Sequence, residues 1–341
     1  MSDKEITVLW LRPSTGENVS VRRERIAEHL EKKNVQVTIC DTSGLDAFGA
    51  ISEVLSTEYD VIIGNVRIGL YLGYALSIAL RKPLIGDVSD SIEDLNHLPA
   101  PVYGSIRAFE WWVLARSQTC FFVEADSYET AKDRGLHPIL ARNAVDYDRF
   151  RYPSSKSKDQ AHKALKEGGV ALDNPIAIYI GSMVPHYYLS EIGDAAERTP
   201  GWEFVFIGKD RGAGIQEIVS ERENAHFLGS FEYDLIPGFL YHGSAGLCLA
   251  DREQPLKIME YGAAGLPTLG YNGKLRKNFS DDELVFVDAD PAEISDVLRR
   301  LSSDNKLASM YGENLQQKAK EHSWKAVAEQ YYEQIVKATE H

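Results

Sequence analysis

Cysteine is scarce in this chain, and the few cysteines present show no pattern of a metal site. Among 341 residues there are only Cys40, Cys120 and Cys248, which lie far apart and each in or beside an apolar run. No CxxC or Cys/His spacing indicates zinc, so we expect no bound metal. Buried, reduced thiols in a cytoplasmic protein are the expected state, because free cysteine is among the most buried residue types.

Long apolar runs are also absent. An uncharged, mostly apolar stretch covers residues 68–80, between Arg67 and Arg81, and its 13 residues fall short of the ~20 that a membrane span needs. It is expected to form a buried helix. The first five residues are polar and lead into a strand-like run, so we expect no signal peptide.

Basic residues are outnumbered. The chain has 37 Lys and Arg against 51 Asp and Glu, a net charge of −14. This balance argues against nucleic acid as the main partner, since phosphate neutralisation needs a basic face. It also argues against simple adhesion to an anionic membrane, although a local basic patch is compatible with it. No G-x-G-x-x-G follows the first strand, which argues against a nicotinamide dehydrogenase.

The composition, 44% hydrophobic and 26% charged, suits two cores at ~150 residues per domain. In the first half, continuous apolar strands are expected at 6–11, 35–40, 60–64, 83–86, 119–123 and 139–141. Helices between them are expected at 21–33, 45–55, 67–80, 103–117 and 127–134. This alternation is typical of a parallel sheet with helices on both faces.

A polar, serine-rich stretch at 154–159 suggests a linker, after which the alternation restarts. Strands are expected at 176–180, 204–207, 226–228, 245–249, 267–269 and 284–287. Helices are expected at 189–198, 215–222, 235–242, 256–264 and 291–302, with a long helical tail from about 306. The fold class is therefore α/β, with two successive Rossmann-like units and ligands expected at the carboxyl ends of the strands.

The most informative segment is 250–270, where a strand ends and a helix opens at Pro255. Proline suits a first helical turn, and the free N–H groups of that turn form an anion site. Lys257 would add positive charge, and Glu260 lies one turn further on a similar face. A pyrophosphate at Lys257 and a ribose at Glu260 would suit a nucleotide diphosphate. An ordinary surface salt bridge is the alternative for this pair.

The pattern P-L-K-x-x-E-Y-x-A-x-G-x-P from Pro255 to Pro267 resembles the donor-site motif of GT-B glycosyltransferases, especially family 4. In that family the last Glu of E-x7-E holds the ribose, and Glu260 matches it, with Gly265 and Pro267 at the family's offsets. The resemblance is supported by three further segments: N-A-V-D-x-x-x-F from Asn143, F-L-G-S-F at 227–231 and H-S-W-x-x-V-A at 322–328.

This resemblance implies two Rossmann-like domains facing across a cleft: an acceptor domain at 1–152, a donor domain at 153–322 and a final helix at 323–341 that crosses back to the first domain. It also implies a metal-independent hexosyltransferase-like enzyme (EC 2.4) that uses no cofactor. The donor would be a UDP- or GDP-sugar, and the acceptor a glycan, a lipid-linked sugar or a small molecule.

Two departures from the family pattern matter. Arg252, with Glu253 beside it, stands where the first Glu of E-x7-E usually contacts the donor sugar. The Arg and Lys expected after the strand at 176–180 are missing, and Lys257 is expected to take over the phosphate role, as in a divergent branch with a P-x-K-x-x-E-Y motif. A non-catalytic sugar-binding or partner subunit and a nucleotide-sugar epimerase therefore remain alternative functions.

Other donor-binding candidates follow strands. Gly181 and Ser182 could offer N–H and hydroxyl groups to phosphate, or form a plain turn. His186 could contact phosphate or sugar, although a surface histidine is the commoner case. Gly16 fits the loop after the first strand that approaches donor phosphates and acceptor in the family.

An inverting transferase needs a carboxylate to take the acceptor proton. Asp90 is the first candidate and Asp87 the second, since both follow the strand at 83–86. The alternative is a helix N-cap, where Asp is favoured. His97 is a further candidate for a role near the acceptor.

The aromatic stripe F-E-W-W-V-L at 109–114 is expected to pack in the core. The alternative is a dock for a lipid-linked acceptor, with Arg107 and Arg116 nearby. The expected location is therefore the cytoplasm, with weak peripheral contact at the inner face of the cell membrane as an option.

Overall fold

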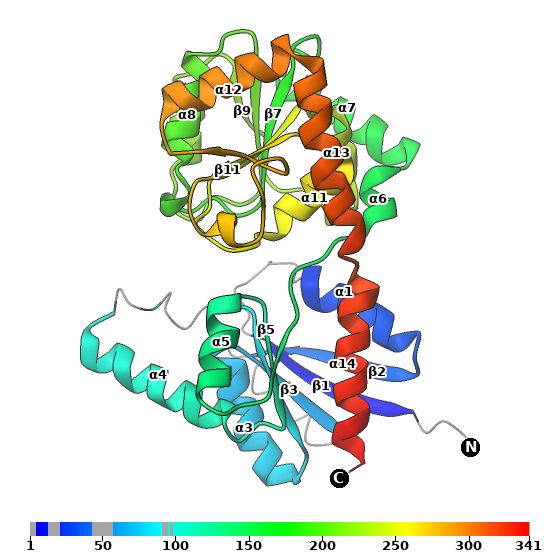
Figure 1. The fold of residues 1–341 in the computed structure, drawn as a ribbon. Helices are drawn as coiled ribbons and strands as arrows, with labels where there is room; N and C mark the ends of the chain where they lie inside the picture. Colours follow the sequence, from blue (N-terminus) through cyan, green and yellow to red (C-terminus); the bar gives the residue numbers. More distant parts are fainter. Residues whose placement is uncertain (1–4, 13–20, 43–56, 91–94, 96–97, 341) are drawn as a thin grey trace. The chain divides into compact units, whose positions relative to one another are not determined.

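The computed structural model describes residues 5–12, 21–42, 57–90, 95 and 98–340. The chain divides into two compact units. Unit 1 comprises Met1–Arg142 together with Trp324–His341, and unit 2 comprises Asn143–Ser323. Each unit contains a six-stranded parallel sheet, which confirms the predicted α/β class with two Rossmann-like units (Figure 1).

In unit 1 the strand order is β2-β1-β3-β4-β5-β6. The strands are β1 (Ile6–Arg12), β2 (Val35–Asp41), β3 (Val61–Asn65), β4 (Leu84–Val88), β5 (Thr119–Phe122) and β6 (Pro138–Leu140). The helices are α1 (Val21–Glu31), α3 (Ile68–Leu80), α4 (Ala100–Leu114), α5 (Ala125–Asp133) and α14 (Trp324–Thr339).

Alternation along β1 shows how this sheet is covered. Leu9 and Leu11 join an apolar cluster with Leu70 of α3. Trp10, between them, stacks on Tyr331 of α14 with the ring centroids 5.3 Å apart. Because successive strand side chains point to opposite faces, α3 and α14 cover opposite faces of the sheet.

In unit 2 the strand order is β12-β11-β10-β7-β8-β9. The strands are β7 (Ile176–Ile180), β8 (Glu203–Ile207), β9 (Ala225–Phe227), β10 (Ala245–Cys248), β11 (Thr268–Tyr271) and β12 (Val285–Val287). The α-helices are α6 (Tyr147–Arg151), α7 (Ser155–Glu167), α8 (Leu189–Glu197), α9 (Ile215–Ser220), α10 (Ile236–His242), α11 (Leu256–Ala264), α12 (Pro291–Ser303) and α13 (Asn305–Glu321). Short 3₁₀ turns are η2 (Pro185–Tyr187), η3 (Tyr233–Leu235) and η4 (Lys274–Lys277).

The two faces of the unit 2 sheet have separate apolar cores. Ile178 of β7 packs in the core that contains Ile258 of α11, whereas Tyr179 packs in the core that contains Ile192 of α8. The two cores hold the carboxyl end of β7 between the layers that α11 and α8 form.

Two sequence-based expectations need correction. Residues 154–159 are not a linker: Ser154 caps α7 by accepting a hydrogen bond from the Ser157 amide at 3.1 Å, and α7 continues to Glu167. The tail is not one helix, because α13 ends before His322, whose carbonyl accepts from the Val145 amide at 3.1 Å. The helix expected at 45–55 lies outside the described residues.

The division between the units falls at 142/143, whereas the sequence placed a domain boundary at 152/153. The intervening segment belongs to unit 2 because α6 packs against α10 and α11. Within the described ranges, no helix is both long and apolar enough to traverse a bilayer.

Gly312 of α13 lies directly against the C-terminal end of α11. A Cβ at this position would come within 2.4 Å of the Gly265 carbonyl oxygen. We therefore expect Gly312→Ala to lower the free energy of unfolding by about 1–3 kcal/mol, since backbone must move to admit the methyl group. Chemical denaturation measures the change.

Gly104→Ala in α4 is the matched control. A Cβ there would meet no described atom within 4 Å, so the gain in helix propensity should stabilise by about 0.5–1 kcal/mol. Destabilisation by both variants to the same extent would contradict the close-packing explanation.

Candidate functional site

The first turn of α11 lies at the carboxyl end of the unit 2 sheet and carries a buried cation. Lys257 stands in this turn, and its Nζ is buried with no hydrogen-bond acceptor among the described residues. Pro255 precedes the helix, the described part of the chain places no side-chain cap on it, and the first turn has no acidic residue. The helix therefore presents free N–H groups and positive charge together.

Two tyrosine rings hold the Lys257 ammonium in place. Its Nζ lies 3.7 Å from the ring centroid of Tyr179 and 5.5 Å from that of Tyr187. Cation–π contact offsets part of the desolvation of the ammonium, but burial still lowers the pKa of Lys257. A buried cation without a hydrogen-bonded anionic partner is costly to the fold, so this position favours an anionic ligand.

The strand ends beside Lys257 are joined by two glycines in the left-handed region. Gly181 has φ +111°, and a Cβ there would lie 3.3 Å from Lys257 Nζ. Gly208 has φ +142°, and a Cβ there would lie 2.0 Å from the Gly181 carbonyl oxygen. Any residue with a side chain at position 208 would require this backbone to move. The glycines thus keep the space over Lys257 free of side chains.

Glu260, one turn further along α11, is also buried. Its Oε1 accepts a hydrogen bond of 2.7 Å from the Tyr233 hydroxyl. Burial raises the pKa of Glu260 to about 7, against the opposing effects of the Tyr233 hydrogen bond and of Lys257. This carboxyl group therefore changes charge near neutral pH, unlike an ordinary surface Glu. The two side chains form no direct salt bridge in the described structure, contrary to the simplest alternative for this pair.

The position of α11 is fixed by contacts at both of its faces. The Tyr261 hydroxyl donates to the Leu247 carbonyl of β10 at 3.2 Å and accepts from the Ile180 amide of β7 at 3.0 Å. Gly262 lies against Leu315 of α13, where a Cβ would approach to 2.8 Å. These contacts hold the first turn of α11 at the ends of β7 and β10.

Arg252 and Glu253 differ in their surroundings. The Arg252 Nε donates to the Tyr187 hydroxyl at 3.3 Å, which places its guanidinium beside the ring that faces Lys257. Glu253 is buried and lies 3.5 Å from Lys277 Nζ, and its carbonyl accepts from Asn278. Arg252 and Lys257 thus both contact Tyr187, whereas Glu253 contacts residues at the end of η4.

Ser182 and His186 are the remaining unit 2 candidates. The Ser182 carbonyl accepts a 2.7 Å hydrogen bond from the Tyr179 hydroxyl, which anchors the loop after β7. His186 is exposed, with its ring edge-on to Tyr187 at a centroid distance of 4.8 Å. Both lie in the segment that supplies the tyrosine rings around Lys257.

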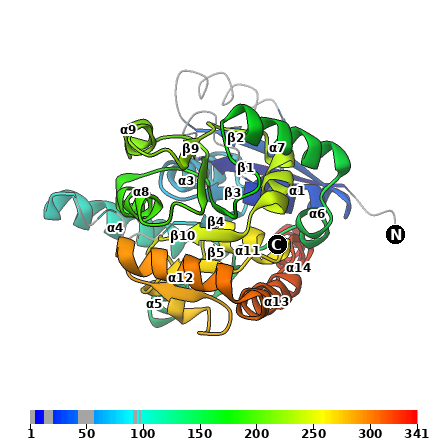
Figure 2. The ribbon, with the colours of Figure 1, turned by 90° about the horizontal axis from the view of Figure 1, so that it is seen from above.

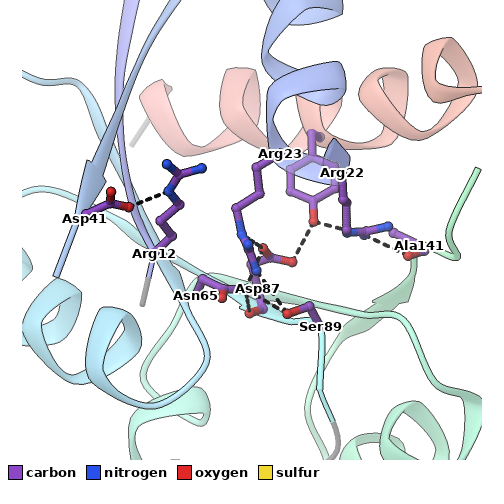
Figure 3. A network of polar contacts seen from close by, with 9 residues as sticks. Arg12, Arg22, Arg23, Asp41, Asn65, Asp87, Ser89 and Ala141 are labelled. Carbon is purple, nitrogen blue, oxygen red and sulfur yellow. Dashed lines mark hydrogen bonds and ion pairs between the residues drawn. The ribbon is translucent and has the colours of Figure 1, made fainter. Parts of the chain in front are cut away.

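In unit 1, Asp87 forms the centre of a buried network (Figure 3). Its carboxylate accepts hydrogen bonds from the Tyr331 hydroxyl at 2.8 Å and from Asn65 Nδ2 at 2.9 Å, and it lies 3.6 Å from Arg23 Nε. The side chain is fully buried. These contacts give Asp87 a role in joining β4 to α1, β3 and α14, and its function as a proton acceptor stays a prediction.

Asp90, the first base candidate, is exposed after the end of β4. It acts electrostatically on Arg23, whose guanidinium donates to Ser89 Oγ at 3.0 Å. Its role as the base stays a prediction. Gly16 and His97 lie outside the described residues.

Sequence reasoning did not identify Tyr179, Tyr187, Tyr233 or Gly208. The tyrosines reach the site from β7, η2 and η3, and no local spacing marks them. The sequence does contain a signal for Gly208, because this glycine directly follows the buried strand β8, as Gly181 follows β7. Among the residues that the structure describes, no three His, Cys, Asp or Glu side chains come together as a metal-binding group.

Comparisons with known proteins bear on the fold and the relatives of this chain. A family model described as glycosyl transferase-like matches residues 190–333. TuaH of Bacillus subtilis (strain 168), whose name assigns it to teichuronic acid biosynthesis as a glycosyltransferase, is 26% identical over 160 residues. The matched segment covers 44% of this chain and 37% of TuaH.

Solved structures resemble the chain over nearly its whole length. HepE of Anabaena, in complex with UDP and glucose, aligns with a TM-score of 0.78 at 16% identity, covering 97% of this chain and all of HepE. Sucrose-phosphate synthase of Thermosynechococcus elongatus aligns with a TM-score of 0.76 at 16% identity, covering 98% of this chain and 100% of that one. The fold is therefore the GT-B fold, and segments of the chain are similar in sequence to the glycosyl transferase-like model and to TuaH.

Proposed function

We propose that this chain transfers a sugar from a nucleotide-diphosphate sugar to an acceptor, and that unit 2 binds the donor. The observation that carries the proposal is the buried Lys257 ammonium at the uncapped start of α11. In support, HepE was solved with UDP and glucose, and the name of TuaH describes a glycosyltransferase.

The pyrophosphate would lie over Lys257 and Gly181. Free N–H groups at the start of α11 would donate to its oxygens, and Lys257 would neutralise charge. Gly181 lacks the side chain that would otherwise fill this space. The ligand would thus supply the hydrogen-bonded anion that Lys257 lacks in the described structure.

The ribose would lie at Glu260, one helical turn from Lys257. An ionised carboxylate accepts hydrogen bonds from a diol, so ribose binding would favour the charged form of Glu260. Tyr233 already orients this carboxyl group through its 2.7 Å hydrogen bond. The assignment of the chain to the branch with the P-x-K-x-x-E-Y motif belongs to the same proposal.

The chemistry would be hexosyl transfer of the EC 2.4 kind. Lys257 and the helix start would stabilise the leaving nucleotide as the glycosidic bond to its phosphate breaks, which provides the charge stabilisation without a metal. A carboxylate, with Asp90 as the candidate, would take the proton of the attacking hydroxyl. The acceptor would be a glycan, a lipid-linked sugar or a small molecule, and a weak peripheral membrane contact would involve unit 1.

Lys257→Met tests the donor site. We expect the affinity for UDP, measured by calorimetry, to fall by about 100-fold, since removing one member of a buried charge pair costs 2–5 kcal/mol. The free energy of unfolding should stay equal or rise, because an apolar side chain replaces a desolvated ammonium.

Lys163→Met is the control, because Lys163 is 75% exposed on α7 of the same unit. It should leave UDP affinity unchanged. UDP binding at full strength by the Lys257 variant would overturn the site assignment. If wild-type chain bound UDP-glucose without hydrolysing it or transferring its sugar, the non-catalytic alternative would replace the enzymatic one.

We expect Glu260 to make donor binding depend on pH. Since its pKa is about 7, the competent carboxylate is a minor species at pH 6 and dominant at pH 8. The affinity for UDP-glucose, whose diester pyrophosphate does not titrate in this range, should rise about tenfold from pH 6 to pH 8.

Glu260→Gln should flatten this profile. The free protein gives a second readout: because the folded-state pKa is raised from 4.5, stability should decline as pH rises from about 4.5 through 7 in wild type and decline less in the variant. A wild-type affinity that is constant between pH 6 and pH 8 would refute ribose binding by ionised Glu260.

A further inference from the structure

Helix α4 of unit 1 has an exposed face without charge. The first half of the helix extends away from the strands of its unit in both views (Figures 1 and 2). The exposed residues of α4, which is described throughout, are Ala100, Pro101, Val102, Gly104, Ser105, Ala108, Phe109 and Trp112. In a chain with 26% charged residues, a solvent-facing helix normally carries charges on that face.

Large aromatic rings are fixed in this exposed position. Phe109 is 45% and Trp112 42% exposed, and their rings stack at a centroid distance of 5.7 Å. Two tyrosine rings of α3 pack against them. The ring centroid of Tyr71 lies 4.8 Å from that of Phe109, and the centroid of Tyr74 lies 5.1 Å from that of Trp112. The expectation of core packing for 109–114 therefore holds for Glu110, Trp111, Val113 and Leu114, while the rings of Phe109 and Trp112 are exposed.

A groove beside these rings is basic. Its volume is about 470 Å³, and its lining includes Arg107, Arg116 and Arg134 with Trp111 and Trp112, but no carboxylate among the described residues. The Arg116 guanidinium stacks 3.7 Å over Trp112, and that of Arg134 lies 4.7 Å over Trp111. A stacked guanidinium keeps N–H groups at its edge for phosphate oxygens.

The one carboxyl group on α4 itself is turned inward. Glu110 of α4 is completely buried and points toward Arg67, with Oε2 and Nε 3.9 Å apart. Burial raises the pKa of Glu110 to about 7. The groove is therefore locally positive on a chain whose net charge is −14.

We propose that α4 docks unit 1 on an anionic lipid surface. Phe109 and Trp112 would enter the boundary between headgroups and acyl chains, and the arginines of the groove would bind lipid phosphates. Charge decides against a second copy of this chain as the occupant, because pairing two such surfaces would bring arginines against arginines, whereas an anionic bilayer attracts them. The proposal goes beyond the donor site and involves no residue of unit 2.

Vesicle flotation of the full chain tests this surface. Vesicles of phosphatidylcholine alone are compared with vesicles that contain phosphatidylglycerol, at low and high salt. We expect binding to the anionic vesicles, weakening with salt, and little binding to the neutral ones. Equal binding to both vesicle types, or none to either, would overturn the proposal.

Two variants separate the apolar and the basic contributions. Phe109→Gln with Trp112→Gln should lower the bound fraction about tenfold by removing the inserted rings. Arg116→Gln with Arg134→Gln should lower it about fivefold for each arginine lost. Circular dichroism of the full chain shows whether each variant is folded. Its UDP affinity shows whether the proposed donor site of unit 2 is unaffected.

Tyr241→Ser is the matched control, because Tyr241 is an exposed aromatic residue of unit 2 (58%). It should bind vesicles like wild type. A wild type that sediments as a dimer, becomes monomeric in the Phe109/Trp112 variant and ignores vesicles would show that a second copy covers the face. Loss of UDP binding in the Lys257 variant with vesicle binding intact would show that the two surfaces act independently.

Discussion

A buried ammonium group that forms no hydrogen bond or salt bridge in the described structure is the constraint around which unit 2 is organised. Lys257 lies over Tyr179 at the start of α11, and burial lowers its pKa. Holding it there requires the strand ends of β7 and β8 to meet through Gly181 and Gly208, and α11 to be fixed by Tyr261. The fold thus contains a locally unfavourable charge, whose compensation by a diphosphate is the basis of the proposed function.

Unit 1 differs in that its central charge is compensated. Asp87 receives hydrogen bonds from Tyr331 and Asn65 and lies beside Arg23. With these partners, Asp87 connects the end of β4 to α1, β3 and α14. Asp87, inside β4, thus has hydrogen-bond partners for its charge, whereas Lys257, in the first turn of α11, has no hydrogen-bond acceptor in the described structure.

The sequence predicted those parts of the molecule that depend on local pattern. Strand–helix alternation, the start of α11 and the spacing of Lys257 and Glu260 are all local. The capped start of α7 was misread because Ser154 and its polar neighbours have the composition of a loop. The helical pattern by itself did not show the break between α13 and α14, and only the family resemblance gave a separate final helix from 323. The tyrosine rings around Lys257 come from distant segments, so no local signal could place them there.

The contact between Tyr331 and Asp87 spans 244 positions of sequence and lies inside unit 1. Tyr331 also stacks on Phe121 at a centroid distance of 3.7 Å, so the core of this unit contains a residue from α14. Unit 2, by contrast, is one continuous segment from Asn143 to Ser323. During synthesis, therefore, all residues of unit 2 are made before α14. The strands of unit 1 are made earlier still, but their core is incomplete until α14 has been added.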